Sequence, residues 1–180
     1  MDIELVESTY WNRISYQIDE EFGEGVTHKL IRERVPVRIE DEPLDSIYLV
    51  PREWVRIIES TISGLDVYSL GLWFGDVHQD RLRLSLPILN PLAELTSNLI
   101  HVERIAAESF TYGRSIIKES VIDVDQSLKR RQRVIILNEI DEVLGLAELA
   151  VDAARIPYLK AEDLVAKNLI DIGWYIRRLG

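Results

Sequence analysis

Apolar residues near the start of the chain recur at steps of three and four residues. The residues with this spacing are Trp11, Ile14, Ile18 and Phe22. Gly23 follows directly, and this combination is typical of an amphipathic helix with a glycine just past its end. Between positions 28 and 39, β-branched and charged residues alternate loosely around Pro36, which cannot donate a backbone hydrogen bond to a central ladder. The pattern predicts a helix, then one edge strand or two short ones.

The next segment alternates between strand and helix signals. A β-rich run over 46–50 leads to Pro51, a residue favoured in the first turn of a helix, and Ser63-Gly64 suits the end of that helix. Strands over 67–74 and 81–86 then flank a turn at 75–79, because Leu82, Leu84 and Leu86 alternate with polar residues. The N-terminal half is therefore predicted to be an antiparallel α/β domain.

The two prolines and two asparagines between 87 and 98 indicate a boundary, and the domains are expected at 1–94 and 95–180. Beyond this boundary, turn residues separate short apolar runs, with one short helix near 106–112. The expected strands cover 99–103, 115–124, 132–138, 144–151 and 164–167. Several short strands in roughly 85 residues favour a small closed β-barrel over a two-sheet sandwich. The predicted fold class is α+β.

The net charge of −10 belongs mainly to the first domain. Residues 1–96 hold 18 acidic and 9 basic side chains, whereas residues 97–180 hold 13 and 12. Nucleic-acid binding requires clustered lysine and arginine, so the net charge alone argues against a nucleic-acid partner, but the uneven distribution of charge matters more than the total. Two domains with different partners are expected.

Several chemistries are disfavoured by residue types. The chain has no cysteine, so disulfides, thiol nucleophiles and cysteine zinc sites are excluded. His28, His78 and His101 are scattered without acids at metal-ligand spacing, and no phosphate-binding glycine loop or glycine-flanked nucleophilic serine occurs. We expect no catalysis, no metal and no cofactor. The acidic N-terminus and the absence of an apolar run of about 20 residues predict a cytoplasmic protein.

Ordered sequence blocks from about Ser46 onward carry a family resemblance. In the first half they are Ile47-Tyr48-Leu49-Val50, Ile62-Ser63-Gly64, Ser69-Leu70-Gly71, Phe74-Gly75 and Arg83-Leu84. In the second half they are Glu108-Ser109-Phe110, Tyr112-Gly113, Ile117-Lys118, Leu144-Gly145, Asp171-Ile172-Gly173 and Tyr175-Ile176-Arg177. Over roughly three quarters of its length the chain resembles the Nip-seven ribosome-biogenesis factors. Separately, its amino-acid composition suits a protein of a thermophilic archaeon.

This resemblance implies an N-terminal pre-PUA domain followed by a PUA domain, a small barrel that binds RNA. It also implies a non-catalytic role in maturing large-subunit ribosomal RNA, with RNA on the PUA domain and proteins on the first domain. The chain departs from the family pattern in two regions. Ile105-Ala106 replaces Pro-Gly, and Ala147, Glu148 and Asp152 replace a glycine and basic residues, so we expect a reduced or shifted RNA surface.

Six basic residues are the predicted RNA contacts: Arg114, Lys118, Arg155, Lys160, Lys167 and Arg177. The first two sit in and after the Tyr112-Gly113 turn, which the resemblance assigns to the RNA surface. Arg155, Lys160 and Lys167 flank Tyr158, and cations interleaved with an aromatic suit single-stranded RNA. The alternative for Tyr158 is packing. Arg177 is expected to be an exposed cation near the C-terminus.

Other charged runs admit two interpretations. Lys129-Arg130-Arg131-Gln132-Arg133 can hold phosphates or form a solvated turn. The acidic runs at 19–21 and 40–42 suit solvated surfaces, or docking of basic assembly or processing proteins. Two other functions remain open: an accessory RNA-binding subunit of an RNA-modifying enzyme, and a protein-only scaffold that has lost its RNA affinity.

Overall fold

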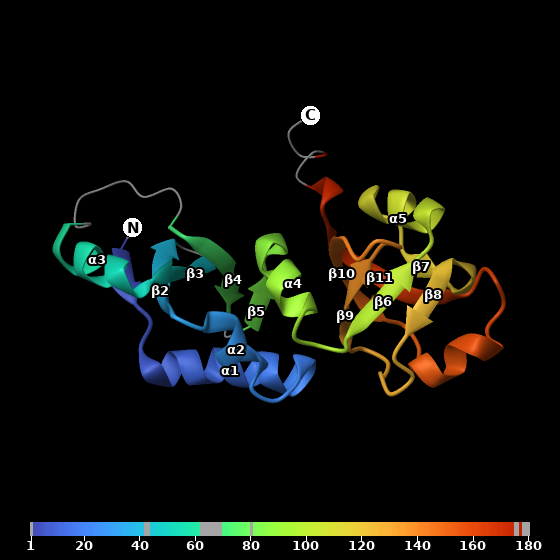
Figure 1. Cartoon of the computed structure of the whole chain (residues 1–180), viewed down its shortest axis with the longest axis horizontal. Helices are drawn as coiled ribbons and strands as arrows, with labels where there is room; N and C mark the ends of the chain where they lie inside the picture. Colours follow the sequence, from blue (N-terminus) through green and yellow to red (C-terminus); the bar gives the residue numbers. More distant parts are fainter. Residues whose placement is uncertain (1, 42–43, 62–69, 80, 175–176, 178–180) are drawn as a thin grey trace. The chain divides into compact units, whose positions relative to one another are not determined.

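The computed structural model of the chain describes residues 2–41, 44–61, 70–79, 81–174 and 177 (Figure 1). It divides into two compact units, Met1–Leu95 and Thr96–Gly180. This division lies one residue from the boundary expected from the sequence.

The N-terminal unit contains an antiparallel sheet whose five strands follow their order in the chain. The strands are β1 (Asp2–Leu5), β2 (Arg34–Asp41), β3 (Leu44–Pro51), β4 (Leu72–His78) and β5 (Arg81–Leu84). Its helices are α1 (Ser8–Phe22), α2 (Val26–Ile31), the 3-10 turn η1 (Arg52–Trp54), α3 (Val55–Thr61) and α4 (Leu86–Ala93). The predicted opening helix and the hairpin of β4 and β5 are both present.

Apolar side chains of the helices pack on this sheet. Helix α1 buries Ile14, Ile18 and Phe22, the residues whose spacing predicted it. The ring of Trp11 lies 5.5 Å from that of Phe74 on β4, measured between centroids. Ile58 of α3 belongs to a separate buried cluster with strands β2 and β3.

The expected edge strand over 28–39 is wrong in two respects. Its first residues belong to helix α2, and β2 lies between β1 and β3 instead of at an edge. Pro36 is tolerated there because it lies opposite Val6, just beyond the end of β1 at Leu5. The Pro36 carbonyl still accepts the Val6 amide at 3.1 Å, so the missing proline N–H falls where the ladder already ends.

Two further expectations for this unit need correction. The turn placed at 75–79 is too early, because β4 continues to His78. The segment from Pro87 to Asn98, interpreted as a domain boundary, begins within helix α4, which starts at Leu86 and buries four apolar side chains. Pro87 is compatible with this helix because it occupies the first turn, whereas Pro91 lies inside the helix and removes one backbone hydrogen-bond donor. The expected helix end at Ser63-Gly64 lies outside the described residues.

The C-terminal unit is a nearly closed, barrel-like sheet of six strands. In spatial order they are β7 (Ile116–Ile117), β11 (Leu164–Asp171), β10 (Val143–Leu149), β9 (Arg133–Leu137), β6 (Leu99–Val102) and β8 (Val121–Val124). Strands β6 and β9 are parallel and the other pairs are antiparallel. The α+β fold class and its small barrel are therefore confirmed.

Within residues 96–172 this unit also has three helical segments: α5 (Arg104–Thr111), η2 (Lys118–Ser120) and η3 (Ala153–Tyr158). The strand expected over 115–124 is interrupted by η2, which separates β7 from β8. The barrel interior is filled by apolar side chains, and Phe110 of α5 is fully buried among them. Helix α5 is thus fixed to the barrel by its buried face.

Candidate nucleic-acid interface

Helix α5 ends in a tight turn that presents Arg114. Gly113 has a φ of +87°, a left-handed conformation that glycine adopts without strain. Its amide donates to the Phe110 carbonyl at 2.9 Å, and the Arg114 amide donates to the Ser109 carbonyl at 3.2 Å. The Tyr112-Gly113 pair therefore reverses the chain and leaves the Arg114 side chain exposed.

Beside α5 lies a hollow of about 490 Å³, which we call the α5 groove. It is lined by Glu103, Ile105, Ala106, Ser109, Arg114, Ser115, Ile117, Glu119 and Ser120. These residues come from α5, from the turn after it, and from β7 and η2. The groove lies entirely within the C-terminal unit.

The groove combines one cation, three hydroxyls and exposed apolar surface. Ile105 is 77% exposed, and the guanidinium of Arg114 can bind a phosphate through two parallel hydrogen bonds. Serine hydroxyls can donate to phosphate or ribose oxygens, and an exposed apolar side chain can contact the face of an unpaired base. Glu103 and Glu119 on the same surface oppose a polyanion, so binding would depend strongly on Arg114.

Asn168 on β11 holds the turn that carries Arg114. Its Nδ2 donates to the Phe110 carbonyl at 3.0 Å and lies 3.4 Å from the Arg114 carbonyl. Its backbone amide donates to Ser115 Oγ at 3.3 Å. A single strand residue thus contacts the backbone on both sides of Gly113, which fixes the direction in which Arg114 leaves the turn.

Asp171 and Arg177 form the next layer of this network. Arg177 Nη1 and Nη2 donate to Asp171 Oδ1 and Oδ2 at 3.0 and 2.9 Å, and Arg177 also donates to the Thr111 carbonyl. The hydrogen bond with Asp171 raises the pKa of Arg177, so its charge persists at all ordinary pH values. The guanidinium of Arg177, predicted to contact RNA, is bound to a carboxylate that is 1% exposed.

The backbone amides of Lys118 and Lys160 both donate to Asp163. The Lys118 amide donates to the Asp163 carbonyl at 2.9 Å. The Lys160 amide donates to Asp163 Oδ2, also at 2.9 Å. Lys118 stands between the groove residues Ile117 and Glu119 in sequence, but neither lysine is among the residues that line the groove.

The remaining predicted contacts lie elsewhere on the barrel. Arg155 is exposed on η3, which lies at the other end of the unit from α5 (Figure 1). Tyr158, on the same turn, is 88% exposed, so packing does not account for it. Lys167 pairs across the sheet with Glu148, which also faces Arg133 on β9. The six predicted residues therefore do not form one surface.

The basic run at 129–133 forms an ordered turn. The Arg131 amide donates to the Leu149 carbonyl at 2.8 Å, and the Arg130 amide donates to Asp152 Oδ1 at 2.9 Å. Asp152, one of the departures from the family pattern, therefore has a structural role in this turn. The side chains of Lys129, Arg130 and Arg131 are exposed.

Sequence reasoning missed the serines of the α5 groove and the positioning role of Asn168. Serines carry no distinctive spacing, and Asn168 acts on residues 53 to 58 positions away.

The described residues contain no group of three or more histidine, cysteine, aspartate or glutamate side chains placed to hold a metal. In the same part of the chain, no helix has the length and apolar character to cross a membrane.

Comparisons with known proteins agree with this architecture. Residues 98–180 match the family model described as the UPF0113 PUA domain. A protein of Rattus norvegicus named "60S ribosome subunit biogenesis protein NIP7 homolog" is 27% identical over 134 residues, which cover 74% of each chain. The homologue of the same name from Sus scrofa is 25% identical over the same share of each chain.

Solved structures share the fold over nearly the whole chain. A conserved PUA domain protein from Thermoplasma acidophilum has a TM-score of 0.69 at 13% identity, and 99% of each chain is covered. A hypothetical protein from Pyrococcus horikoshii has a TM-score of 0.67 at 14% identity, with 97% of this chain and 98% of that chain covered. The C-terminal unit is therefore a PUA domain, and over three quarters of its length the chain is similar to the Nip-seven proteins.

Proposed function

We propose that this chain is a non-catalytic, RNA-binding assembly factor for ribosome biogenesis that acts on precursors of the large subunit. Single-stranded RNA binds in the α5 groove of the PUA unit, and basic assembly proteins bind the acidic N-terminal unit. The curated relatives, named as 60S biogenesis proteins, support the process. The α5 groove supports the RNA contact.

One observation carries the proposal: the turn at Gly113 fixes an exposed Arg114 between hydroxyl groups and exposed apolar surface. Phosphates hold an RNA strand in place, whereas bases need stacking or apolar contact, and the groove supplies groups for both. Ile105 and Ala106, which replace Pro-Gly of the family pattern, line this groove. The departure therefore changes the surface on which bases would lie.

The experiment is a titration of single-stranded RNA followed by fluorescence anisotropy at two salt concentrations. Arg114→Ala should weaken binding about tenfold, the usual range for a charge-assisted hydrogen-bond pair. Arg104→Ala is the matched control, because Arg104 is exposed on the same helix but does not line the groove. Equal affinities for wild type and Arg114→Ala would contradict the groove assignment.

A second candidate is a protein-only scaffold, favoured by Glu103 and Glu119 in the groove. On this alternative the protein shows no salt-sensitive RNA binding at all. Recovery of pre-ribosomal proteins in a pull-down would then identify it as a scaffold, whereas recovery of one RNA-modifying enzyme would identify an accessory subunit.

Acidic runs of the N-terminal unit have partly internal roles. Asp19 Oδ1 accepts the Thr27 amide at 2.7 Å, and Glu40 is paired with Arg38. The exposed remainder, including Glu20, keeps the unit negative and suits a basic protein partner.

A further inference from the structure

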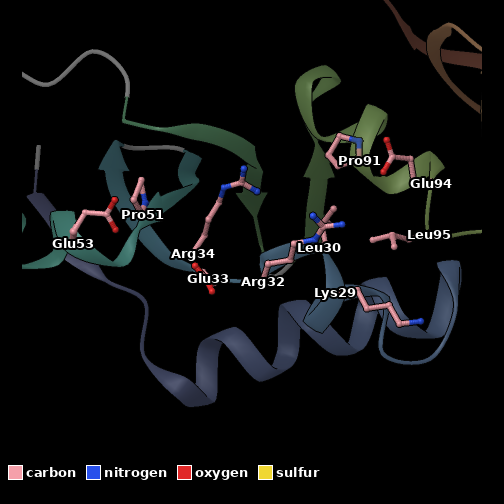
Figure 2. A pocket seen from close by; sticks show the side chains of 10 residues that line it. All are labelled: Lys29, Leu30, Arg32, Glu33, Arg34, Pro51, Glu53, Pro91, Glu94 and Leu95. Atoms are coloured by element: carbon pink, nitrogen blue, oxygen red, sulfur yellow. The ribbon is translucent and has the colours of Figure 1, made fainter.

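A hollow of about 640 Å³ lies in the N-terminal unit, within the size range of small-molecule sites (Figure 2). Its walls are the C-terminal end of α2, the start of β2, the end of β3 and the end of α4. Arg34 and Pro51 are cross-strand neighbours in this wall. Leu30, which is buried, and Pro91 supply apolar surface.

Three basic residues within six positions line this hollow: Lys29, Arg32 and Arg34. Among the residues that the structure describes, no hydrogen bond or ion pair engages their side chains. Arg38, four positions further along β2, differs because Glu4, Glu40 and Asp45 surround it. Figure 2 shows the Arg32 and Arg34 side chains on the same side of the backbone and Glu33, which also lines the hollow, on the opposite side.

The backbone of Arg32 is unusual. Its φ of 51° and ψ of −115° lie in a region that L-residues avoid and glycine adopts freely. A cation at the end of α2 is favoured by the helix dipole, but the dipole explains neither this conformation nor Arg34 on a strand. An arginine held where glycine fits better indicates that its side chain is used.

We propose that this hollow binds a single phosphoryl group between Arg32 and Arg34. Two planar guanidinium groups match phosphate oxygens, and their two charges balance a phosphate monoester. Glu33, Glu53 and Glu94 also line the hollow and would repel further phosphates. The ligand is therefore the terminal phosphate of an RNA strand or a small phosphorylated molecule. That RNA supplies the phosphoryl group rests on the proposed function, whereas the phosphoryl site itself does not.

The test uses two RNA oligonucleotides of one sequence, with a 5′-phosphate or a 5′-hydroxyl, and a separate titration with inorganic phosphate. Phosphate should shift the NMR amide signals of residues 29–34. If RNA is the source, the 5′-phosphate strand binds about tenfold tighter than the 5′-hydroxyl strand. If only phosphate shifts these signals, the source is a small molecule. No shift together with equal RNA affinities overturns the proposal.

Three variants sharpen this test. Arg34→Gln should abolish the response to phosphate. Arg32→Gly should also abolish it while raising the unfolding midpoint by about 2–4 °C, because glycine relieves the backbone. Arg56→Gln, at an exposed position on α3, is the control and should respond like wild type. An unchanged response in Arg32→Gly and Arg34→Gln would contradict the site.

Two further outcomes distinguish this phosphoryl site from the α5 groove and from a protein-docking surface. Arg114→Ala should weaken both oligonucleotides equally and leave the response to inorganic phosphate intact, so failure of the RNA groove is distinguishable from failure of this site. A glutamate-rich peptide that shifts the same amide signals at lower concentration than phosphate would identify a protein-docking surface and overturn the phosphoryl assignment.

Discussion

The buried carboxylate of Asp171 is held by both terminal nitrogens of Arg177, at 3.0 and 2.9 Å. This ion pair attaches the C-terminal segment to α5, because Arg177 also donates to the Thr111 carbonyl. Gly173 permits the approach, since a Cβ there would lie 2.0 Å from that carbonyl oxygen.

Asp171→Ala should lower the free energy of unfolding by about 1–3 kcal/mol, because it removes the partner of a charge and breaks a bond to Asn168. The side chain of Arg177 is 37% exposed, so it can reach water once Asp171 is removed. Urea denaturation measures the change. Glu108→Ala, which breaks the exposed pair with Arg104, should cost no more than about 0.5 kcal/mol. Similar losses for both variants would contradict a structural role for the buried pair.

Asn168→Ala should weaken RNA binding about fivefold, because the loss of its bonds to the backbone frees the Arg114 turn. If Asn168 acts only by positioning Arg114, this effect disappears in an Arg114→Ala background. Anisotropy titrations of the wild type, the two single variants and the double variant form the required cycle. Independent, additive losses would show that Asn168 does not act through Arg114.

Two glycines should differ in their tolerance of alanine. At Gly145, with φ +155°, a Cβ would lie 2.1 Å from the Ile170 carbonyl oxygen, so β10 and β11 must separate. At Gly113 the nearest atom is Arg177 Nη2 at 3.5 Å, and only the conformational cost of about 1 kcal/mol remains. Thermal unfolding should therefore show a much larger loss for Gly145→Ala. An equal loss at both positions would mean that the strands adapt to the added methyl group.

Glu148 limits the contribution of Lys167 to RNA binding. The two residues are cross-strand partners, and Glu148 also faces Arg133. Glu148→Gln should raise RNA affinity about two- to fivefold if Lys167 contacts phosphate, because opposite charges in register attract by up to about 1 kcal/mol. Lys167→Ala should then abolish the gain. No change in either variant would remove this strand from the RNA surface.

Periodicity predicted the regular elements well. The spacing of Ile14 and Ile18 identified α1, and Tyr112-Gly113 identified the turn that presents Arg114. Helix α2 was missed because its β-branched residues have low helix propensity and its stability comes from elsewhere in the chain. Thr27 shows this dependence: its amide donates to Asp19 and its hydroxyl to the Ser15 carbonyl.

The candidate site was predictable only where the signal is local. Arg114 follows a recognisable glycine turn, whereas Asn168 lies in the middle of a strand and acts through contacts with a distant turn. Arg177 was predicted from its charge and its place near the C-terminus, but that charge is bound to Asp171. Arg155 on η3 and Arg114 after α5 were both assigned to one predicted RNA surface. The sequence alone does not reveal which end of the barrel each residue occupies.

The central claim is that RNA lies in the α5 groove. Its most direct test is to map backbone amide shifts while a 5′-hydroxyl single-stranded RNA is titrated into the full chain. We expect the largest shifts at residues 103–120, together with Asn168, and little change at residues 29–34 or 153–158. Shifts confined to η3 and the 129–133 turn, or no shifts at any concentration, would contradict the claim.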